Sequence, residues 1–319
     1  MPETVTPEAD SPDAPVLVIR HGALGDFVLS FGPFMAIRAR HRQARITLLT
    51  GAPFAGLARM SGWFDEILVD ERSRNPLRLW RLRRHLLAGG YDWVYDLQTS
   101  NRSGRYLRFW PSDRRPNWSG VAPGCSHPHR NPDRDHMHTL ERQREQLADA
   151  GIAAVPPADL DWLAGDLAGF DLSDSQRLLL LVPGGSAHRP EKRWPAAHYE
   201  TLARQALAAD LTPLLIGGPD ENGLAAAIPS ARSLIGETDF PQLASLARRA
   251  VAAVGNDTGP MHLLAAAGAP SLTLFSNASD PALCAPRGPA VEVLQQAALA
   301  DLSPQTVWAA LEALALSSP

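Results

Sequence analysis

Short apolar runs alternate with amphipathic stretches along the chain, and this alternation is what most limits its fold. In the first half, strands are expected at Val16–Arg20, Arg45–Thr50, Glu66–Val69 and Trp93–Leu97, and helices near Gly25–Arg40, Pro53–Met60, Pro76–Leu87 and Thr139–Ala150. Strands and helices that alternate in this way are typical of a parallel sheet covered by helices. The first half therefore predicts a doubly wound α/β domain.

A second series of the same kind follows a stretch rich in Pro, Ala and Asp. Its expected strands are Leu178–Val182, Pro213–Ile216, Ala252–Val254 and Ser271–Phe275, and its expected helices are Ala196–Asp210, Glu221–Ile228, Pro241–Ala250 and Gly259–Ala267. We therefore predict a disordered tail (1–14), an N-terminal Rossmann-like domain (15–155), a linker (156–174), a C-terminal Rossmann-like domain (175–300) and a final helix (301–319) that packs back on the first domain. Two such domains facing each other would leave a cleft at the carboxyl ends of their strands, where such sheets bind ligands.

The bulk composition excludes several classes of protein. Hydrophobic residues make up 45% and charged residues 20% of the 319 residues, an ordinary globular balance that suffices for two cores. No apolar run approaches the roughly 18 to 20 residues of a membrane-spanning helix, and the acidic, Pro-rich start does not resemble a signal peptide. Two cysteines, Cys125 and Cys284, are too few for a disulfide framework. We therefore expect a cytoplasmic protein.

Charge is distributed unevenly along the chain. Residues 1–155 hold 21 Arg, no Lys and 17 acidic residues, a net charge of +4, whereas the remainder holds 9 basic and 17 acidic residues, a net charge of −8. The basic half, with clusters at Arg72–Arg84 and Arg102–Arg115, suits an anionic partner, although a solvated arginine-rich surface explains the charge equally well. Lys192 is the one Lys among 30 cationic residues, which marks a position suited to a compact ammonium.

A glycine-containing loop follows the first expected strand and carries the candidate catalytic acid. The run Gly22, Ala23, Leu24, Gly25 and Asp26 permits a tight turn and a close approach of the backbone to a ligand. The alternative role for Asp26 is to cap the first helix, where Asp is favoured. The loop lacks the Gly-x-Gly-x-x-Gly pattern of dinucleotide-binding folds, which counts against a nicotinamide dehydrogenase.

Two further loops follow strands of the second half. Gly185 and Ser186 end the first of these strands and Lys192 follows them, so that backbone N–H groups and an ammonium together suit a phosphate. Glu221 follows the next strand, where a carboxylate can accept hydrogen bonds from a ribose diol. The alternatives are a plain strand–helix connection and an acid that complements a helix dipole.

The most specific motif is Gly-Asn-Asp-Thr-Gly-Pro-Met-His at 255–262, between an apolar strand and an Ala-rich helix. Thr258 and Gly259 can offer backbone N–H groups to a diphosphate at the start of that helix. His262 lies one turn further on and could face the ligand, although a His in this position is more often a packed residue. A phosphate would repel Asp257, so we expect Asp257 to position the loop or to contact hydroxyls.

These loops, in this order and spacing, resemble glycosyltransferase family 9, the ADP-heptose:lipopolysaccharide heptosyltransferases. The resemblance runs from about Val16 to Pro289, and its most specific parts are GALGD at 22–26, GGS and KRWP within 184–195, and NDTGPMH at 256–262. It implies a GT-B fold, with the acceptor bound by the first domain and the nucleotide sugar by the second. Asn277–Pro281 departs from the Gly-Pro-Thr-Asp-Pro that the family often has, and this leaves the contacts to the donor's base or sugar open.

The resemblance also implies an inverting, metal-independent transfer of a sugar, heptose from ADP-heptose, to a lipopolysaccharide core or related anionic envelope glycolipid, with no cofactor. Asp26 then matches the general base on the acceptor hydroxyl, Lys192 the cation on the donor diphosphate and Glu221 the acid on the ribose. The other donor-binding residues are Gly185, Ser186, Asp257, Thr258, Gly259 and His262, and the acceptor-side loop is Gly22, Ala23, Leu24 and Gly25. With Asp26 in one domain and the phosphate loops in the other, closure of the cleft would assemble the site and exclude water.

Other functions remain open at this point. A sugar-nucleotide epimerase of the same fold would act without an acceptor, and a non-catalytic nucleotide-sugar binder would be indifferent to the loss of Asp26. The Asp-x-Asp pairs at 133–135 and 159–161 and the His-rich segment Ser112–His138 match no standard metal site. We expect no nucleic-acid partner, and peripheral contact with the inner membrane through the basic half. The donor sugar, the acceptor position, the oligomeric state and the role of Ser112–His138 are left open.

Overall fold

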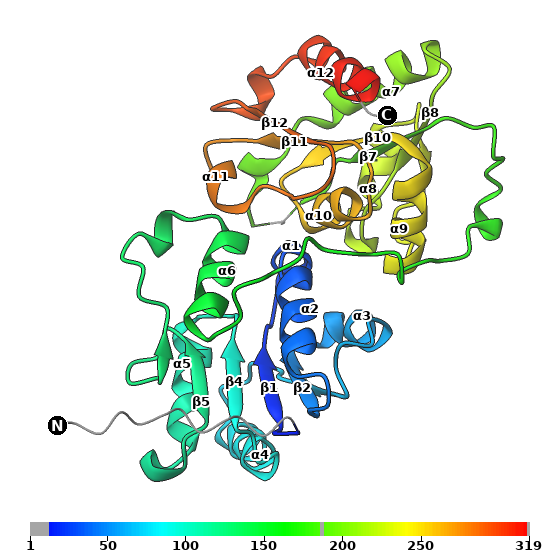
Figure 1. Cartoon of the computed structure of the whole chain (residues 1–319). Helices are drawn as coiled ribbons and strands as arrows, with labels where there is room; N and C mark the ends of the chain where they lie inside the picture. The colour runs from blue at the N-terminus through cyan, green and yellow to red at the C-terminus, as the bar shows by residue number, and fades with distance from the viewer. Residues whose placement is uncertain (1–12, 186–187, 318–319) are drawn as a thin grey trace. The chain divides into compact units, whose positions relative to one another are not determined.

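The computed structural model describes residues 13–185 and 188–317, which form two compact units (Figure 1). The first unit contains residues 13–22, 33–131 and 143–156, and the second contains 23–32, 132–142, 157–185 and 188–317. The chain therefore passes between the units several times. Both sheets and their covering helices fit the predicted α/β class.

The sheet of the first unit has six parallel strands in the order β3-β2-β1-β4-β5-β6. They are β1 (Val16–Ile19), β2 (Ile46–Thr50), β3 (Glu66–Val69), β4 (Trp93–Asp96), β5 (Asn117–Gly120) and β6 (His127–Pro128). The central strands are apolar and buried on both faces, as expected of a parallel sheet between helices. The helices are α2 (Phe31–Arg40), α3 (Ala55–Met60), α4 (Pro76–Ala88), α5 (Asn101–Tyr106) and α6 (Thr139–Asp149), and the division between the units falls within α2 and α6.

The sheet of the second unit also has six parallel strands, in the order β12-β11-β10-β7-β8-β9. They are β7 (Leu178–Val182), β8 (Thr212–Leu215), β9 (Arg232–Ser233), β10 (Ala250–Asn256), β11 (Ser271–Phe275) and β12 (Val291–Gln295). The helices are α1 (Leu24–Val28), α7 (Ala196–Ala208), α8 (Gly223–Ala227), α9 (Phe240–Arg249), α10 (Gly259–Ala266), α11 (Pro281–Cys284) and α12 (Pro304–Ser317). Helices α7 and α12 cover one face of this sheet and α9 and α10 the other (Figure 1).

Three expectations need correction. The helix expected at Gly25–Arg40 is interrupted after Val28, because Pro33 has no N–H with which to continue the ladder and the Ser30 hydroxyl donates back to the Asp26 carbonyl. The final helix, α12, does not belong to the first domain: Val307 and Leu311 lie in the core of the second unit. Residues 23–32, expected in the first domain, are grouped with the second.

The segment Ser112–His138 shows no clear helix or strand periodicity in the sequence, and we expected a long loop there, but it contains strands β5 and β6 and two short 3-10 turns. In the part of the chain that the structure describes, no helix is both long and apolar enough to cross a membrane.

Candidate functional site

A buried amide side chain fixes the ends of two central strands of the second sheet. Asn256 is the last residue of β10, and its Nδ2 donates to the carbonyls of Pro183 and Gly184, at 2.8 and 2.9 Å. Its Oδ1 accepts from the Trp194 backbone N–H at 2.9 Å and from the Tyr199 hydroxyl at 3.1 Å. The loop after β7, the start of α7 and the loop after β10 are therefore held together by one residue.

The predicted phosphate cation lies beside the β10–α10 loop. The Lys192 ammonium donates to Asp257 Oδ2 at 2.6 Å, and both side chains are largely buried, at 16% and 9% exposed. The Ser279 hydroxyl donates to the same oxygen at 2.7 Å. Asp257 thus holds Lys192 in place, which is compatible with the positioning role expected for this acid.

Two donors next to this loop have no hydrogen-bond partner among the residues that the structure describes. They are Thr258 Oγ1 and Arg193 Nε, and both atoms are buried. Gly185 lies between them, since a Cβ there would be 3.4 Å from the Thr258 methyl group and 3.7 Å from Arg193 Nε. Thr258 is also the N-cap of α10, with no side-chain capping bond. Unpaired donors at a helix N-terminus suit an anion, because a buried donor without a partner is costly.

The carboxylate of Glu221 joins two glycine loops. Oε1 accepts from the Gly185 N–H at 2.8 Å and Oε2 from the Gly218 N–H at 3.0 Å. Glu221 therefore shapes the loops after β7 and β8, and its contact with a ribose stays a prediction. Each carboxylate oxygen has a second lone pair, so both can still accept from a diol.

Asp26 lies on α1, which packs on α10 within the second unit. A Cβ on Gly259 of α10 would come 2.6 Å from Leu24 Cβ, and one on Gly25 would come 2.6 Å from His262 Cδ2. The two helices approach so closely because glycine stands at both points of contact. The expectation that Asp26 lies in the other domain from the phosphate loops is therefore wrong: residues 23–32 and the loops share one unit.

His262 is buried beside this helix contact. Burial lowers its pKa to about 4, against the opposing influence of the Asp257 and Asp26 carboxylates. The imidazole is therefore neutral near pH 7. Its Nδ1 has no hydrogen-bond partner within the described ranges. His262 is therefore a packed residue that also lies close to charged groups.

His138 reaches the same unit from the His-rich segment, and sequence reasoning gave it no role in the site. Its Nε2 bonds the Ala285 carbonyl at 2.9 Å, and burial lowers its pKa although that hydrogen bond opposes the shift. His138, Lys192, Asp26 and Asp257 all act electrostatically on His262. Neither the spacing nor the composition of residues 112–138 gave a signal for this placement.

The second unit thus brings together Asp26, Lys192, Glu221, Asp257, Thr258, Gly259, His262 and Gly185. Ser186 lies outside the described residues. Of the predicted acceptor-side loop, Ala23, Leu24 and Gly25 belong to the second unit and Gly22 to the first. Gly22 has a φ of +84°, and a Cβ there would collide with the Phe54 ring, so glycine is required. Whether this loop contacts an acceptor stays a prediction.

A polar network that the sequence did not predict lies in the first unit. Asp70 follows β3, and its carboxylate is 3.0 Å from His21 Nε2 and 3.3 Å from Arg102 Nη2, and it accepts from the Tyr106 hydroxyl at 2.5 Å. Burial alone would raise the pKa of Asp70, but hydrogen bonds from His21 and Tyr106 hold it well below its ordinary value. This network fixes the loops after β1 and β3 at one end of the sheet.

The first unit also has a cavity of about 340 Å³ beyond β4 and β5. Its cationic lining residues are Arg105, Arg108 and Arg115, and no Asp or Glu lines it. Thr99, Ser100 and Asn101 add polar groups where β4 ends. Three guanidinium groups around one cavity suit a phosphate or a carboxylate.

Among residues 13–185 and 188–317, no group of three His, Cys, Asp or Glu side chains is arranged to hold a metal ion. The metal independence expected from the sequence stays a prediction.

Comparisons with known proteins point to one family. The sequence profile of glycosyltransferase family 9 (heptosyltransferase) matches residues 79–305. Lipopolysaccharide heptosyltransferase 2 of Escherichia coli is 27% identical, over 94% of this chain and 98% of that protein. The protein of the same name from Salmonella typhimurium is also 27% identical, over 83% of each chain.

Solved structures agree with this result. The structure of E. coli ADP-heptose lipopolysaccharide heptosyltransferase II has a TM-score of 0.73 at 25% identity, over 95% of this chain and 98% of that one. A family 9 glycosyltransferase from Veillonella parvula has a TM-score of 0.81 at 19% identity, over 96% and 98%. E. coli heptosyltransferase WaaC, solved with ADP, has a TM-score of 0.73 at 20% identity, over 94% and 99%. The predicted family resemblance and the predicted fold of two Rossmann-like sheets are confirmed.

Proposed function

This chain belongs to glycosyltransferase family 9, the heptosyltransferases, and we propose that it transfers a heptose from ADP-heptose to the core of a lipopolysaccharide. The observation that carries the proposal is the group of cations and unpaired donors at the N-terminus of α10, together with Asp26 on α1, the helix that packs on α10. The family also decides between the alternatives left open by the sequence: the chain is a glycosyltransferase, and an epimerase, a dehydrogenase or a non-catalytic binder is not supported.

The donor diphosphate would bind at the loops after β7 and β10. Lys192, Arg193 Nε and Thr258 Oγ1 supply donors, and the first backbone N–H groups of α10 add the positive end of its dipole. Glu221 would accept from the ribose hydroxyls with its remaining lone pairs. Support for an ADP donor comes from the related heptosyltransferase whose structure contains ADP.

The transfer itself would be a single displacement that inverts the anomeric carbon. The acceptor oxygen forms a bond to the anomeric carbon while the bond between that carbon and the diphosphate oxygen breaks. Asp26 takes the proton of the acceptor hydroxyl. The charge that develops on the leaving diphosphate is met by Lys192 and the neighbouring donors. His262 is neutral and does not compete with Lys192 for the phosphate.

The acceptor would present an anionic group to the first unit. The cavity lined by Arg105, Arg108 and Arg115 can take a phosphate or a sugar-acid carboxylate, and no lining carboxylate opposes it. We also propose that the protein works on the cytoplasmic side of the inner membrane, with peripheral contact, because its proposed acceptor is a membrane glycolipid.

A transfer assay tests this function. Purified protein is incubated with a heptose-deficient lipopolysaccharide core as the acceptor. The donor is ADP-heptose or, in parallel reactions, a UDP-, GDP- or dTDP-sugar, and each reaction is run with and without EDTA. We expect release of ADP, a mass increase of one heptose on the acceptor, an inverted anomer by NMR and no effect of EDTA. Turnover of another nucleotide sugar in preference to ADP-heptose would reject the donor, and loss of activity with EDTA would reject the metal-free mechanism.

A further inference from the structure

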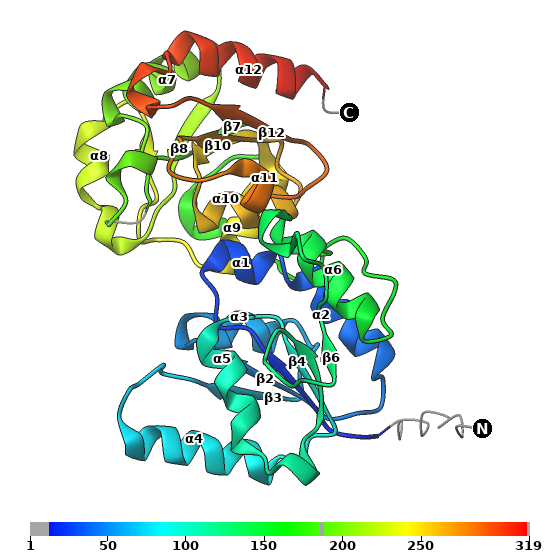
Figure 2. The same cartoon turned by 90° about the vertical axis from the view of Figure 1, so that its left-hand side faces the viewer.

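Helix α4 leaves most of its side chains exposed. Of its 13 residues only Leu86 is buried, whereas Leu77 is 55% and Trp80 51% exposed. Asn75 caps the helix by accepting from the Leu77 N–H, and Pro76 begins it, so the segment is a well-formed helix. Figure 2 shows α4 at the edge of the first unit. Large apolar side chains exposed side by side on one helix indicate a surface that meets a partner.

The same segment is strongly basic. Residues 72–91 contain six Arg and no Asp or Glu. Arg78 is paired with Glu71, just outside the segment, and the Arg84 guanidinium lies 5.0 Å from the centre of the Trp80 ring. Arg81 and Arg83 are exposed. The partner of this surface must therefore carry negative charge and accept apolar side chains.

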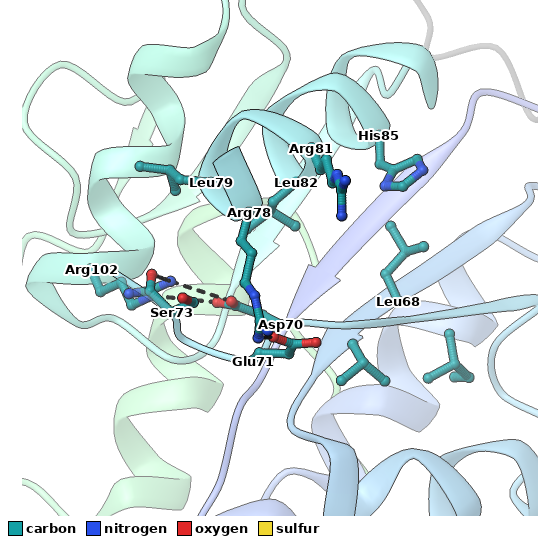
Figure 3. A pocket seen from close by; sticks show the side chains of 12 residues that line it. Leu68, Asp70, Glu71, Ser73, Arg78, Leu79, Arg81, Leu82, His85 and Arg102 are labelled. Carbon is teal, nitrogen blue, oxygen red and sulfur yellow. Dashed lines mark hydrogen bonds and ion pairs between the residues drawn. The ribbon is translucent and has the colours of Figure 1, made fainter. Parts of the chain in front are cut away.

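A cavity of about 370 Å³ lies between α4 and the edge strand β3. Its apolar lining includes Leu68 of β3 and Leu82 of α4, and Arg81 and His85 of α4 line it as well (Figure 3). In Figure 3 these α4 side chains point toward β3, and Leu68 points back toward the helix. Asp70 and Glu71 also line the cavity, and each is paired with an Arg of the same cavity, Arg102 and Arg78. Because both carboxylates are paired, the leucines and Arg81 leave a lining that is complementary to a lipid: apolar side chains for acyl carbon and a guanidinium for a headgroup phosphate.

We propose that α4 and the adjoining edge of β3 dock on an anionic phospholipid surface. Leu77 and Trp80 enter the interfacial region of the bilayer, and the flanking Arg side chains contact the lipid phosphates. The proposal deepens the proposed function, since a glycolipid acceptor is found at such a surface. A second copy of this chain is a poorer occupant, because a twofold contact through α4 would bring the four Arg of each copy's helix together.

Vesicle co-sedimentation of the full chain tests the proposal without donor or acceptor. Wild type is compared on vesicles of phosphatidylcholine alone and of phosphatidylcholine with about one third phosphatidylglycerol, whose negative surface potential attracts basic segments. We expect binding to the anionic vesicles only, and a loss of at least about tenfold in the Leu77→Ala/Trp80→Ala variant. The matched control is Leu207→Ala, on α7 of the second unit, because Leu207 is also exposed, at 53%. This variant should bind vesicles as wild type does.

A second measurement separates insertion from charge attraction. Trp80→Leu keeps an apolar side chain and should retain binding, but the quenching of tryptophan fluorescence by brominated phosphatidylglycerol should fall. Arg81→Gln/Arg83→Gln should weaken binding about tenfold or more, and added salt should weaken wild type in the same way. Wild-type binding by the Leu77→Ala/Trp80→Ala variant, equal quenching in Trp80→Leu, or binding to neutral vesicles would overturn the proposal.

Sedimentation velocity supplies the remaining outcome. A wild-type dimer that becomes monomeric in the Leu77→Ala/Trp80→Ala variant, with no vesicle binding by either protein, would overturn the lipid proposal in favour of a second copy. Transfer to a short, lipid-free acceptor should be unchanged in this variant. If that transfer is absent from wild type as well, the proposed function fails while the vesicle result stands on its own.

Discussion

The His262 ring lies directly against Gly25, at a distance that leaves no room for a side chain there. A Cβ on Gly25 would be 2.6 Å from His262 Cδ2 and 2.8 Å from Nε2. This contact sets the separation of α1 and α10, and with it the position of Asp26 relative to the loop between β10 and α10. The geometry of the proposed catalytic acid thus depends on a glycine one residue before it.

Gly25→Ala should therefore damage both stability and turnover. The new methyl group has to push α1 from α10 or rotate a buried ring, which costs about 1 to 3 kcal/mol. We expect a lower melting temperature and a kcat reduced at least about tenfold, because about 1 Å of displacement suffices for such losses. Gly56→Ala is the control: nothing lies within 4 Å of a Cβ there, and Gly56 is in helix α3, so this variant should be as stable as wild type or more so. Equal melting temperatures for Gly25→Ala and wild type would show that the two helices separate easily.

Asp26→Asn should abolish transfer and leave donor binding almost unchanged. The amide cannot take the acceptor proton, and loss of a general base lowers kcat by about 10²- to 10⁴-fold. ADP binding, measured by calorimetry, should remain within a few-fold of wild type, because the residues proposed to bind ADP lie on the loops after β7 and β10. Full turnover by this variant would refute the base assignment, and loss of ADP binding would indicate a structural role for the carboxylate.

The sequence predicted the parts of the fold that depend on local apolar pattern. The run Leu178–Val182 is entirely buried as β7 and was recognisable as a strand. β5 was missed because its four residues, Asn-Trp-Ser-Gly, show no such pattern, and β12 because it is only partly buried at the edge of its sheet. The break after Val28 was missed because Pro33 lies inside an otherwise helical pattern.

The sequence located candidate residues where glycine and charge stand together at the end of a strand, as for Lys192 and Thr258, and their roles stay predictions. The roles of Asn256 and Arg193 were not predicted, although both lie inside the quoted motifs, because burial decides which polar atoms must find partners. The unit to which Asp26 belongs was also predicted wrongly. Sequence order places Asp26 after β1, whereas the glycine contacts between α1 and α10 place its helix in the second unit.

Lys192→Ala should weaken donor binding for two reasons. The phosphate loses its ammonium, and Asp257 is left as a largely buried carboxylate without its cation, which repels the diphosphate. We expect the Kd for ADP to rise at least about tenfold, with the melting temperature of the protein as a check on folding. The double variant Lys192→Ala/Asp257→Ala should recover part of the affinity, because the repelling charge is removed. If the double variant binds ADP more weakly than Lys192→Ala, Asp257 contacts the donor itself.

Asp96 predicts an effect of pH on stability. It ends β4 and is fully buried, and burial raises its pKa from 3.8 to about 6. Below pH 3.8 the carboxyl is protonated in the folded and unfolded chain alike. Between pH 3.8 and 6 the folded chain binds more protons than the unfolded chain, so the free energy of unfolding falls as pH rises. Above pH 6 the full cost of burying the charged carboxylate is present. At about 1.4 kcal/mol per pKa unit this cost is about 3 kcal/mol at most.

Asp96→Asn should therefore stabilise the first unit at pH 7.5 and have little effect at pH 4. An amide oxygen can still accept from the Thr99 N–H, as Asp96 Oδ1 does at 3.0 Å. The measurement is the urea midpoint of the variant and of wild type at both pH values. The matched control is Asp92→Asn, because Asp92 lies just before the same strand and is exposed, so we expect only a small change in the urea midpoint. If Asp96→Asn is less stable than wild type at pH 7.5, the interactions of the buried carboxylate offset its desolvation. Asp96 would then be charged in the folded protein at that pH.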